Sequence, residues 1–238
     1  MPGVQSTVPA EHKAEAQACK AAARKALMHE MAALARTVLA LAILLLASCS
    51  QPKQETLPPG TKVLALGDSL TAAHGVAPDE AWPALLATRT GWIVVNAGVS
   101  GDTSGGALQR LPALLEEHGP ALVLVTLGGN DMLRRLPQGQ TTANLAQILA
   151  LVKAQGAKAV LLATPRPSIA GAVFNNLSAA DFYQQVAKAQ QVPLIEDALA
   201  DVLSNTELKA DQLHPNAAGH ALLAKKVFEA LKKIGYAR

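Results

Sequence analysis

Short apolar runs alternate along the chain with longer segments in which apolar residues recur at helical spacing. The runs at 61–66, 92–96, 121–127, 159–163 and 193–195 are expected to be strands. Helical periodicity marks 81–88, 104–117, 141–155, 179–190 and 216–234. Four of the runs are continuously apolar, as in parallel strands that are covered on both faces. The alternation predicts an α/β fold, a doubly wound three-layer sandwich around a five-stranded, mostly parallel sheet.

An apolar stretch near the N-terminus has the layout of a secretory signal. Residues 31–48 carry one arginine, Arg36, then an uninterrupted apolar stretch over 38–47 and small residues before Cys49. That stretch is about half of the roughly 20 residues that a membrane-spanning helix needs. The tetrapeptide Leu46-Ala47-Ser48-Cys49 resembles the lipobox of bacterial lipoproteins, in which cleavage leaves a lipid-modified cysteine at the N-terminus. We therefore predict a lipoprotein signal over 31–48 and lipidation of Cys49, with an ordinary signal peptide as the alternative.

The signal divides the rest of the chain. Residues 1–30 precede a complete signal, so we expect Met31 rather than Met1 to be the start and residues 1–30 to be disordered or helical. Residues 49–60 are polar and proline-bearing, as in a flexible tether, and 61–238 form the folded domain. The domain is then exported, faces the periplasm and is held at a bacterial membrane by its lipid. Cys19 precedes that start and Cys49 carries the lipid, so no disulfide is expected.

Composition limits the classes of function. Half of the 238 residues are apolar and only 3% are aromatic, which predicts one aliphatic core. From Cys49 onward 16 Lys and Arg face 15 Asp and Glu, so the domain is nearly neutral. Nothing in that balance suggests a nucleic-acid partner. We expect a single catalytic domain that is monomeric.

Polar motifs follow the predicted strands at the points where the strands end. Gly67-Asp68-Ser69-Leu70 follows the first strand, 98–101 the second, and Gly128-Gly129-Asn130-Asp131 the third. The segment 211–214 precedes the last helix. Because ligands of doubly wound sheets bind at the carboxyl ends of the strands, these motifs are expected to meet there.

Three of these residues could form a nucleophilic system. A serine such as Ser69 attacks a carbonyl well only when an imidazole takes its proton and a carboxylate orients that imidazole. Asp211 and His214 are three residues apart, the spacing that places two side chains on one side of a helical turn. The structural alternatives are a capped turn at Ser69, where Thr71 replaces the second glycine of G-x-S-x-G, and a helix cap after His214.

Two further segments could bind negative charge. The glycine-rich stretch 98–106 lets a backbone N–H approach an oxyanion, or it is a strand-to-helix turn with a capping residue at 102–104. It lacks the spacing of a phosphate-binding loop. The Asn130 amide could donate to developing charge, and a loop is expected after Asp131. The remaining domain histidines, His74, His118 and His220, are interpreted as surface or helix residues without acidic partners.

Together the four motifs resemble the conserved blocks of the GDSL, or SGNH, hydrolase family, over about 62–238. Its bacterial thioesterase, lysophospholipase and arylesterase branch is the one that the segments 81–86, 95–97, 100–104 and 110–115 resemble. The resemblance implies a flavodoxin-like fold, Ser69 as nucleophile, His214 as base and Asp211 as its orienting partner. It also implies an oxyanion hole made by the N–H groups of Ser69 and Gly101 and the Asn130 amide, with no metal or organic cofactor.

The same resemblance points to the substrate side of the site. The segment 132–137 resembles the mobile substrate loop of the branch, so Met132, Leu133 and Leu136 are candidates for contact with an acyl chain. The branch often has a tyrosine in the loop after the fourth strand, whereas segment 164–177 contains Phe174 and no tyrosine. Phe174 is therefore a further substrate-loop candidate, and the preferred chain length stays open. The arginines at 134, 135 and 166 are either solvated surface residues or a site for a phosphate-bearing substrate.

These observations predict an exported carboxylic ester hydrolase that works through an acyl-enzyme intermediate on Ser69. Its expected substrates are short acyl or aryl esters, or lysophospholipids. The alternatives are a carbohydrate deacetylase of the same family, a nucleotide-binding domain that uses 98–106, and a non-catalytic α/β lipoprotein.

Overall fold

The computed structural model describes residues 24–25, 28–31, 55–168 and 176–238. The chain divides into two compact units, Met1–Pro52 and Lys53–Arg238, and the second holds the sheet. The described residues of the first unit are helical. Cys49, the predicted signal beyond Met31 and the start of the tether lie outside the described residues, as does Phe174.

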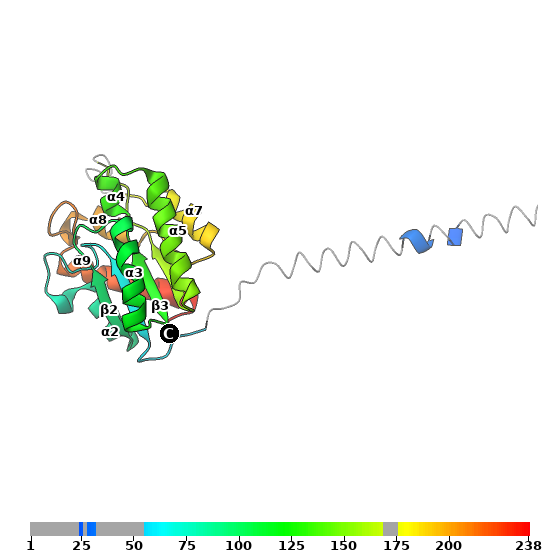
Figure 1. The fold of residues 1–238 in the computed structure, drawn as a ribbon, viewed down its shortest axis with the longest axis horizontal. Helices are drawn as coiled ribbons and strands as arrows, with labels where there is room; N and C mark the ends of the chain where they lie inside the picture. The colour runs from blue at the N-terminus through cyan, green and yellow to red at the C-terminus, as the bar shows by residue number, and fades with distance from the viewer. Residues whose placement is uncertain (1–23, 26–27, 32–54, 169–175) are drawn as a thin grey trace, which may run out of the picture. The chain divides into compact units, whose positions relative to one another are not determined.

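Five parallel strands form the sheet, in the order β2-β1-β3-β4-β5 (Figure 1). They are β1 (Lys62–Gly67), β2 (Ile93–Gly98), β3 (Leu122–Thr126), β4 (Lys158–Leu162) and β5 (Leu194–Ile195). The chain crosses from one side of β1 to the other between β2 and β3. Polar segments after β1, β2 and β3 therefore meet at one edge, as the sequence predicts.

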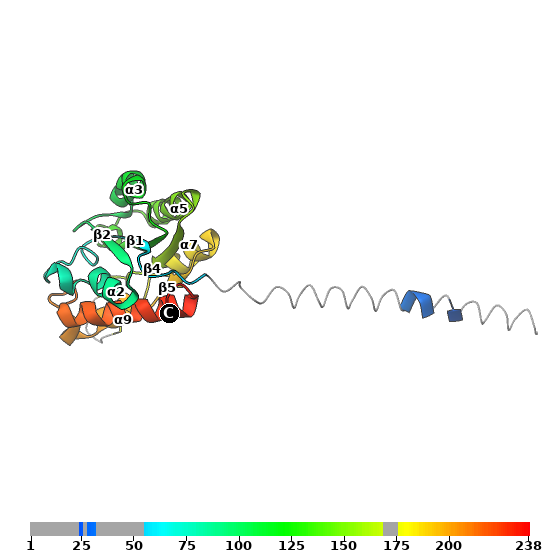
Figure 2. The same ribbon diagram turned by 90° about the horizontal axis from the view of Figure 1, so that it is seen from below.

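Helices cover both faces of the sheet. Figure 2 shows α3 (Ser104–His118), α5 (Gln138–Ala154) and α7 (Phe182–Gln190) on one side, and α2 (Trp82–Thr90) and α9 (Ala217–Ile234) on the other. The short helix α8 (Ala198–Ser204) packs beside α9. The predicted doubly wound sandwich is confirmed.

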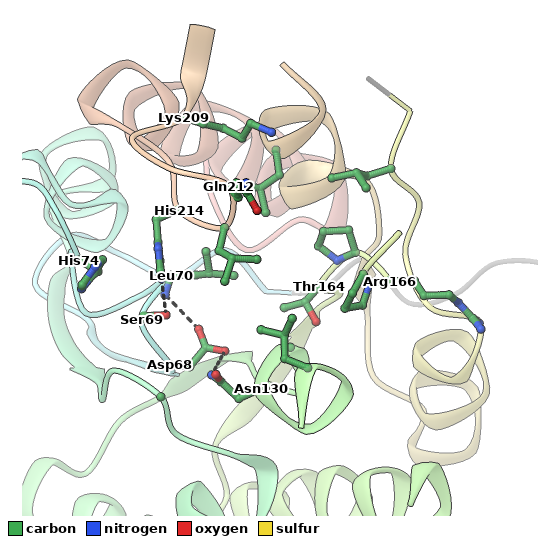
Figure 3. Close-up of a pocket in the computed structure, with 18 of the residues that line it drawn as sticks. Asp68, Ser69, Leu70, His74, Asn130, Thr164, Arg166, Lys209, Gln212 and His214 are labelled. Atoms are coloured by element: carbon green, nitrogen blue, oxygen red, sulfur yellow. Dashed lines mark hydrogen bonds between the residues drawn. The ribbon is translucent and has the colours of Figure 1, made fainter. Parts of the chain in front are cut away.

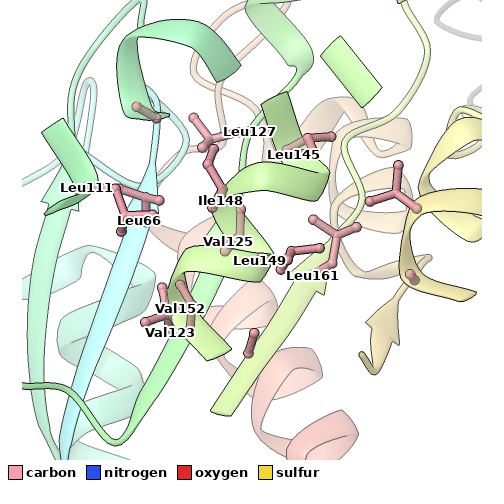
Figure 4. Packing of buried hydrophobic residues seen from close by; sticks show 14 of the residues in the cluster. Leu66, Leu111, Val123, Val125, Leu127, Leu145, Ile148, Leu149, Val152 and Leu161 are labelled. Atoms are coloured by element: carbon pink, nitrogen blue, oxygen red, sulfur yellow. The ribbon is translucent and has the colours of Figure 1, made fainter. Parts of the chain in front are cut away.

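The core is aliphatic and lies in two layers, one on each face of the sheet. Successive residues of β1 point to opposite faces: Leu64 and Leu66 join the layer under α3 and α5, and Val63 and Ala65 join the layer under α2 and α9. Figure 4 shows the first layer, in which Leu111 of α3 and Ile148 of α5 pack on β1 and β3. Burial on both faces explains why the strands read as continuous apolar runs.

Two short helices were not predicted. Helix α4 (Gly129–Leu133) lies where a loop was expected, and α8 follows the last strand. Two single-turn 3-10 helices, η1 (Pro78–Glu80) and η2 (Thr206–Leu208), complete the described elements. The five longer helices were predicted, with ends displaced by no more than three residues.

Close backbone approach brings the ends of β1 and β2 together. A Cβ on Gly98 would lie 2.3 Å from the backbone nitrogen of Ala72, and a Cβ on Gly67 would lie 2.1 Å from Thr71 Oγ1. Only glycine leaves room for the turn after β1 to lie against the end of β2. This contact fixes the turn that carries Ser69.

The chain enters the domain beside the amino ends of the strands, opposite the polar segments that follow β1, β2 and β3. The Leu57 N–H donates to the Tyr236 carbonyl oxygen (2.9 Å), and Thr56 Oγ1 donates to the Gly235 carbonyl oxygen (3.2 Å). The first and last residues of the described domain are therefore joined beside the amino ends of the strands. Among the described residues, no helix combines the length and apolarity that crossing a bilayer requires.

Candidate active site

Ser69, His214 and Asp211 form one continuous chain of hydrogen-bonding groups. His214 Nε2 lies 2.9 Å from Ser69 Oγ, and His214 Nδ1 lies 2.8 Å from Asp211 Oδ2. Figure 3 shows His214 directly above Ser69 at the mouth of the pocket. The turn after β1 and the loop before α9, 145 residues apart in sequence, are thus brought to one point.

The expected helical turn between Asp211 and His214 is wrong. The two residues lie in a bend, folded by the Asp211 carboxylate itself: its Oδ1 accepts from the N–H of Leu213 (2.7 Å) and of His214 (2.8 Å). Burial acts to raise the pKa of Asp211, but these two N–H groups and the His214 ring outweigh it and hold the pKa at about 2. Asp211 is therefore an anion at neutral pH, beside the imidazole.

Ser69 and Gly101 both line the pocket at the site, and the backbone N–H groups of both are free within the described domain. Gly101 has a left-handed backbone with φ of 77°, and its carbonyl oxygen accepts from Arg134 Nη2 at 2.6 Å. The arginine side chain thus fixes the peptide unit after Gly101, and the turn leads into α3, where Thr103 caps the helix. The capped-turn interpretation of the glycine-rich segment is confirmed, and the turn also leaves the Gly101 N–H free within the described domain.

The Asn130 amide is positioned by a buried carboxylate. Asn130 Nδ2 donates to Asp68 Oδ2 (3.1 Å), while Asp68 Oδ1 accepts from the Leu70 N–H (3.0 Å). Because Asp68 is only 2% exposed, burial raises its pKa to about 6, although both hydrogen bonds and His214 act to lower it. An amide nitrogen carries two protons, so Asn130 retains one donor beyond the one that Asp68 uses.

The neighbouring residue, Asp131, holds the short helix α4 in place. Asp131 is buried, and its carboxylate accepts from Ser104 N (2.9 Å), Ser104 Oγ (2.5 Å) and Thr141 Oγ1 (3.2 Å). These donors belong to the first turns of α3 and α5. A helix of five residues is marginal by itself, so this network is what sets the position of Asn130.

A pocket of about 570 Å³ opens beside the serine. Its walls are largely apolar and include Leu70, Leu133, Pro165, Pro167, Leu177, Leu203 and Leu213. Of the predicted acyl contacts, Leu133 lines this pocket and is 45% exposed. Met132 and Leu136 line a neighbouring hollow of about 230 Å³ instead.

The predicted surface arginines have defined contacts. Arg166 lines the pocket and lies 3.3 Å from Asp181, whereas Arg134 is bound to the Gly101 carbonyl. Arg135 has a left-handed backbone with φ of 55° and lines the neighbouring hollow. Arg166 and Lys209 are the cationic residues at the rim of the larger pocket.

His220 lies in helix α9 and His74 is exposed, as predicted, but both make contacts that the sequence did not indicate. His220 is 0% exposed within α9, and its Nδ1 accepts from the Trp82 N–H at 3.3 Å. Burial lowers the pKa of His220 to about 4. His74 lies beside the site, with its ring centroid 4.3 Å from that of His214. Among the described residues, His74, Asp211 and His214 are the one group of three side chains whose ligand atoms could hold a metal ion.

Comparison with known proteins identifies relatives of this chain. Residues 65–222 match the GDSL-like Lipase/Acylhydrolase family. Among curated proteins, an arylesterase of Vibrio mimicus is 37% identical over 178 residues, covering 72% of this chain and 88% of that protein. The thioesterase 1/protease 1/lysophospholipase L1 of Escherichia coli is 40% identical over 177 residues, covering 72% and 84%.

Solved structures extend the likeness to the fold. The crystal structure of TesA aligns with a TM-score of 0.66 at 38% identity, covering 73% of this chain and 99% of that one. The esterase EstA of Pseudoalteromonas sp., in a structure inhibited by monoethylphosphonate, aligns with a TM-score of 0.64 at 31% identity, covering 73% and 97%. The chain therefore belongs to the GDSL-like lipase/acylhydrolase, or SGNH, family and is a carboxylic ester hydrolase.

Proposed function

We propose that the chain cleaves acyl esters through a covalent acyl-enzyme on Ser69, with His214 as general base and acid and Asp211 as its orienting anion. The observation that carries the proposal is the unbroken hydrogen-bonded path from Ser69 Oγ through both nitrogens of His214 to Asp211. With the Nδ1 proton donated to Asp211, Nε2 is the nitrogen that accepts the serine proton.

Acylation follows from that arrangement. Ser69 Oγ attacks the acyl carbonyl carbon as its proton passes to His214 Nε2, and the carbonyl oxygen becomes an oxyanion. The ester C–O bond then breaks, and the imidazolium returns the proton to the leaving alkoxide. The Asp211 anion stabilises the imidazolium between these two transfers.

Deacylation repeats the sequence with water. His214 takes a proton from a water molecule as the water oxygen attacks the acyl carbon. The bond between the acyl carbon and Ser69 Oγ then breaks, the imidazolium returns the proton to Oγ, and the acid is released. The N–H groups of Ser69 and Gly101 and the free proton of the Asn130 amide stabilise the oxyanion in both steps. Each such donor contributes roughly 10²- to 10³-fold in turnover in comparable enzymes.

The pocket supports a substrate with an apolar acyl or aryl group. Apolar side chains form most of its wall, and about 570 Å³ falls within the range of small-molecule sites. The cationic rim residues Arg166 and Lys209 could attract a phosphate group. We therefore propose short acyl esters, aryl esters and lysophospholipids as the substrate class.

We further propose that the enzyme is exported to the periplasm, attached to a membrane by lipid on Cys49, and active as a monomer. The signal-like pattern of 31–48 supports the first two statements. One chain supplies every group that the mechanism uses, so a single copy suffices. Replacing Cys49 with Ala should abolish labelling by a radioactive fatty acid in bacteria that express the full chain; persistent labelling would exclude this site.

The decisive test is hydrolysis of p-nitrophenyl esters from acetate to palmitate. Wild-type protein should hydrolyse the series, and Ser69→Ala should reduce turnover to the background rate. The chain-length optimum distinguishes an arylesterase from a long-chain lipase. Release of fatty acid from a lysophospholipid tests whether the cationic residues at the rim, Arg166 and Lys209, admit a phosphate-bearing substrate.

Ser178→Ala is the matched control for Ser69→Ala. Ser178→Ala removes an exposed serine hydroxyl outside the pocket and should leave turnover unchanged. If Ser69→Ala and Ser178→Ala were equally active, the acyl-enzyme proposal would be wrong. Activity on acetylated sugars with none on the ester series would favour the deacetylase alternative.

A further inference from the structure

We propose that His74, Asp211 and His214 form a binding site for a divalent transition-metal ion such as Zn²⁺, and that the bound ion reversibly blocks hydrolysis. One potential ligand atom from each side chain lies within 4.8 Å of the other two. The blocking part of this proposal rests on the roles given above to Asp211 and His214, whereas the binding part does not.

The reaction leaves His74 without a role. The triad is complete with Ser69, His214 and Asp211, yet a second imidazole lies against His214, with ring centroids 4.3 Å apart and planes inclined at 42° (Figure 3). Within the described domain the His74 side chain makes no hydrogen bond or ion pair. Its nitrogen atoms are therefore available as ligands.

The backbone around His74 is held in an unusual conformation. Ala73 has φ of 65° and Gly75 has φ of 82°, so left-handed residues flank the histidine on both sides. An alanine in this region is strained by its Cβ, and such strain persists where the surrounding structure enforces it. A Cβ on Gly75 would lie 3.8 Å from Ala210 Cβ, so this turn is close to the loop that carries Asp211. The turn thus keeps His74 beside the catalytic loop.

Two imidazoles and one carboxylate form a ligand set that suits Zn²⁺. Three protein ligands and one water make a four-coordinate zinc site, with ligand bonds of about 2.0–2.2 Å. Those bonds place ligand atoms roughly 3.5 Å apart, so a modest rotation of the exposed His74 side chain closes the set. Asp211 Oδ2 already lies 2.8 Å from His214 Nδ1.

A bound ion necessarily interrupts the triad. His214 uses Nδ1 to contact Asp211 and Nε2 to contact Ser69. Whichever nitrogen the ion takes, one of these two contacts is lost, and His214 can no longer carry a proton between Ser69 and the leaving group. Removal of the ion by a chelator restores both contacts.

The first experiment measures binding without catalysis. Zn²⁺ is titrated by calorimetry into the untagged full chain carrying Ser69→Ala, after treatment with EDTA, and into the same chain with His74→Phe added. We expect one site that the His74 substitution weakens at least about tenfold. Ser69→Ala with His118→Phe is the matched control and should keep that site, since His118 lies on α3 away from the pocket.

The second experiment measures inhibition. Saturating Zn²⁺ should abolish hydrolysis of p-nitrophenyl butyrate by the wild-type chain, and EDTA should restore it. The His74→Phe variant should resist inhibition by Zn²⁺, with its rate in Zn²⁺ compared with its own metal-free rate. His74→Gln gives an independent variant should His74→Phe melt at a lower temperature without metal.

The outcomes separate the two proposals. Zinc isotherms that do not depend on His74 in either variant would overturn the site, and binding without inhibition would overturn its effect on hydrolysis. A wild-type chain that shows no hydrolysis before zinc is added would instead contradict the proposed function, while the binding result would still stand.

Discussion

Replacing Asp68 with asparagine should make the protein more stable and less active. Burial raises the pKa of Asp68 from 3.8 to about 6. At about 1.4 kcal/mol for each pH unit, ionising this carboxyl in the folded protein costs about 3 kcal/mol more than ionising it in the unfolded chain. Asparagine resembles the protonated acid in shape and carries no charge, so Asp68→Asn removes this cost.

The gain has a definite pH dependence. Because the folded pKa is raised, the favourable contribution of Asp68 is fully present below pH 3.8 and is lost as the pH rises through 6. Linkage then predicts that the free energy of unfolding of Asp68→Asn exceeds that of wild type by about 3 kcal/mol at pH 8. The difference falls to about half of that at pH 5 and to roughly 0.5 kcal/mol at pH 4. Urea denaturation at the three pH values measures the difference.

The loss of activity comes through Asn130. In the wild type the Asp68 carboxylate accepts from Asn130 Nδ2 and so determines which end of the amide is the donor. An asparagine whose oxygen accepts from Leu70 N–H presents an NH₂ group to Asn130. The Asn130 amide then inverts, and an oxygen replaces the N–H that faces the substrate oxyanion. Turnover should fall roughly 10²- to 10³-fold.

The control is Asp79→Asn, which changes an exposed carboxylate outside the pocket and should shift the unfolding free energy by less than about 0.5 kcal/mol. An Asp68→Asn protein that is destabilised at pH 8, or that shows the same difference at pH 4 and pH 8, would refute the argument from burial. Unchanged turnover would show that Asp68 does not position Asn130.

Three further changes test the site and its support. Asn130→Ala should lower turnover by roughly 10²- to 10³-fold while the melting temperature stays within about two degrees, and unchanged turnover would remove this amide from the mechanism. His220→Gln should flatten the acid side of the stability profile: neutral His220 contributes fully above pH 6.5, and about 3 kcal/mol is lost as the pH falls from 6.5 to about 4. An unaltered slope in urea denaturation would contradict this. Gly219→Ala should destabilise the fold by about 2–3 kcal/mol, because the new Cβ would lie 2.2 Å from the Leu208 carbonyl oxygen. Thermal melting measures this loss. In the control Gly139→Ala, where nothing lies within 4 Å of the new Cβ, the melting temperature should rise or stay unchanged.

The sheet and the convergence of the motifs could be predicted because both depend on local pattern. Continuous apolar runs identify strands buried on both faces, and in a parallel sheet the residues that follow those strands share an edge. That rule is enough to bring Ser69, Gly101 and Asn130 together. It does not give the conformation of each turn.

The features that were missed depend on contacts between distant segments. Helix α4 has five residues and is held by Ser104 and Thr141 from other helices, so its own sequence indicates only a turn. His220 lies at a helical position, but its burial against Trp82 joins residues 138 apart in sequence. The bend at Asp211 was mistaken for a helical turn because three-residue spacing is common to both, and only the two N–H groups that its carboxylate accepts from distinguish them.

The hydrogen bond between Leu57 and Tyr236 has a consequence for attachment of the enzyme to a surface. Both ends of the described domain leave it beside the amino ends of the strands, and Ser69 lies at the carboxyl ends. The point where the upstream chain enters the domain therefore lies opposite the mouth of the pocket. If the enzyme is anchored through that chain as proposed, the attachment would leave its pocket accessible to esters that arrive through the surrounding water.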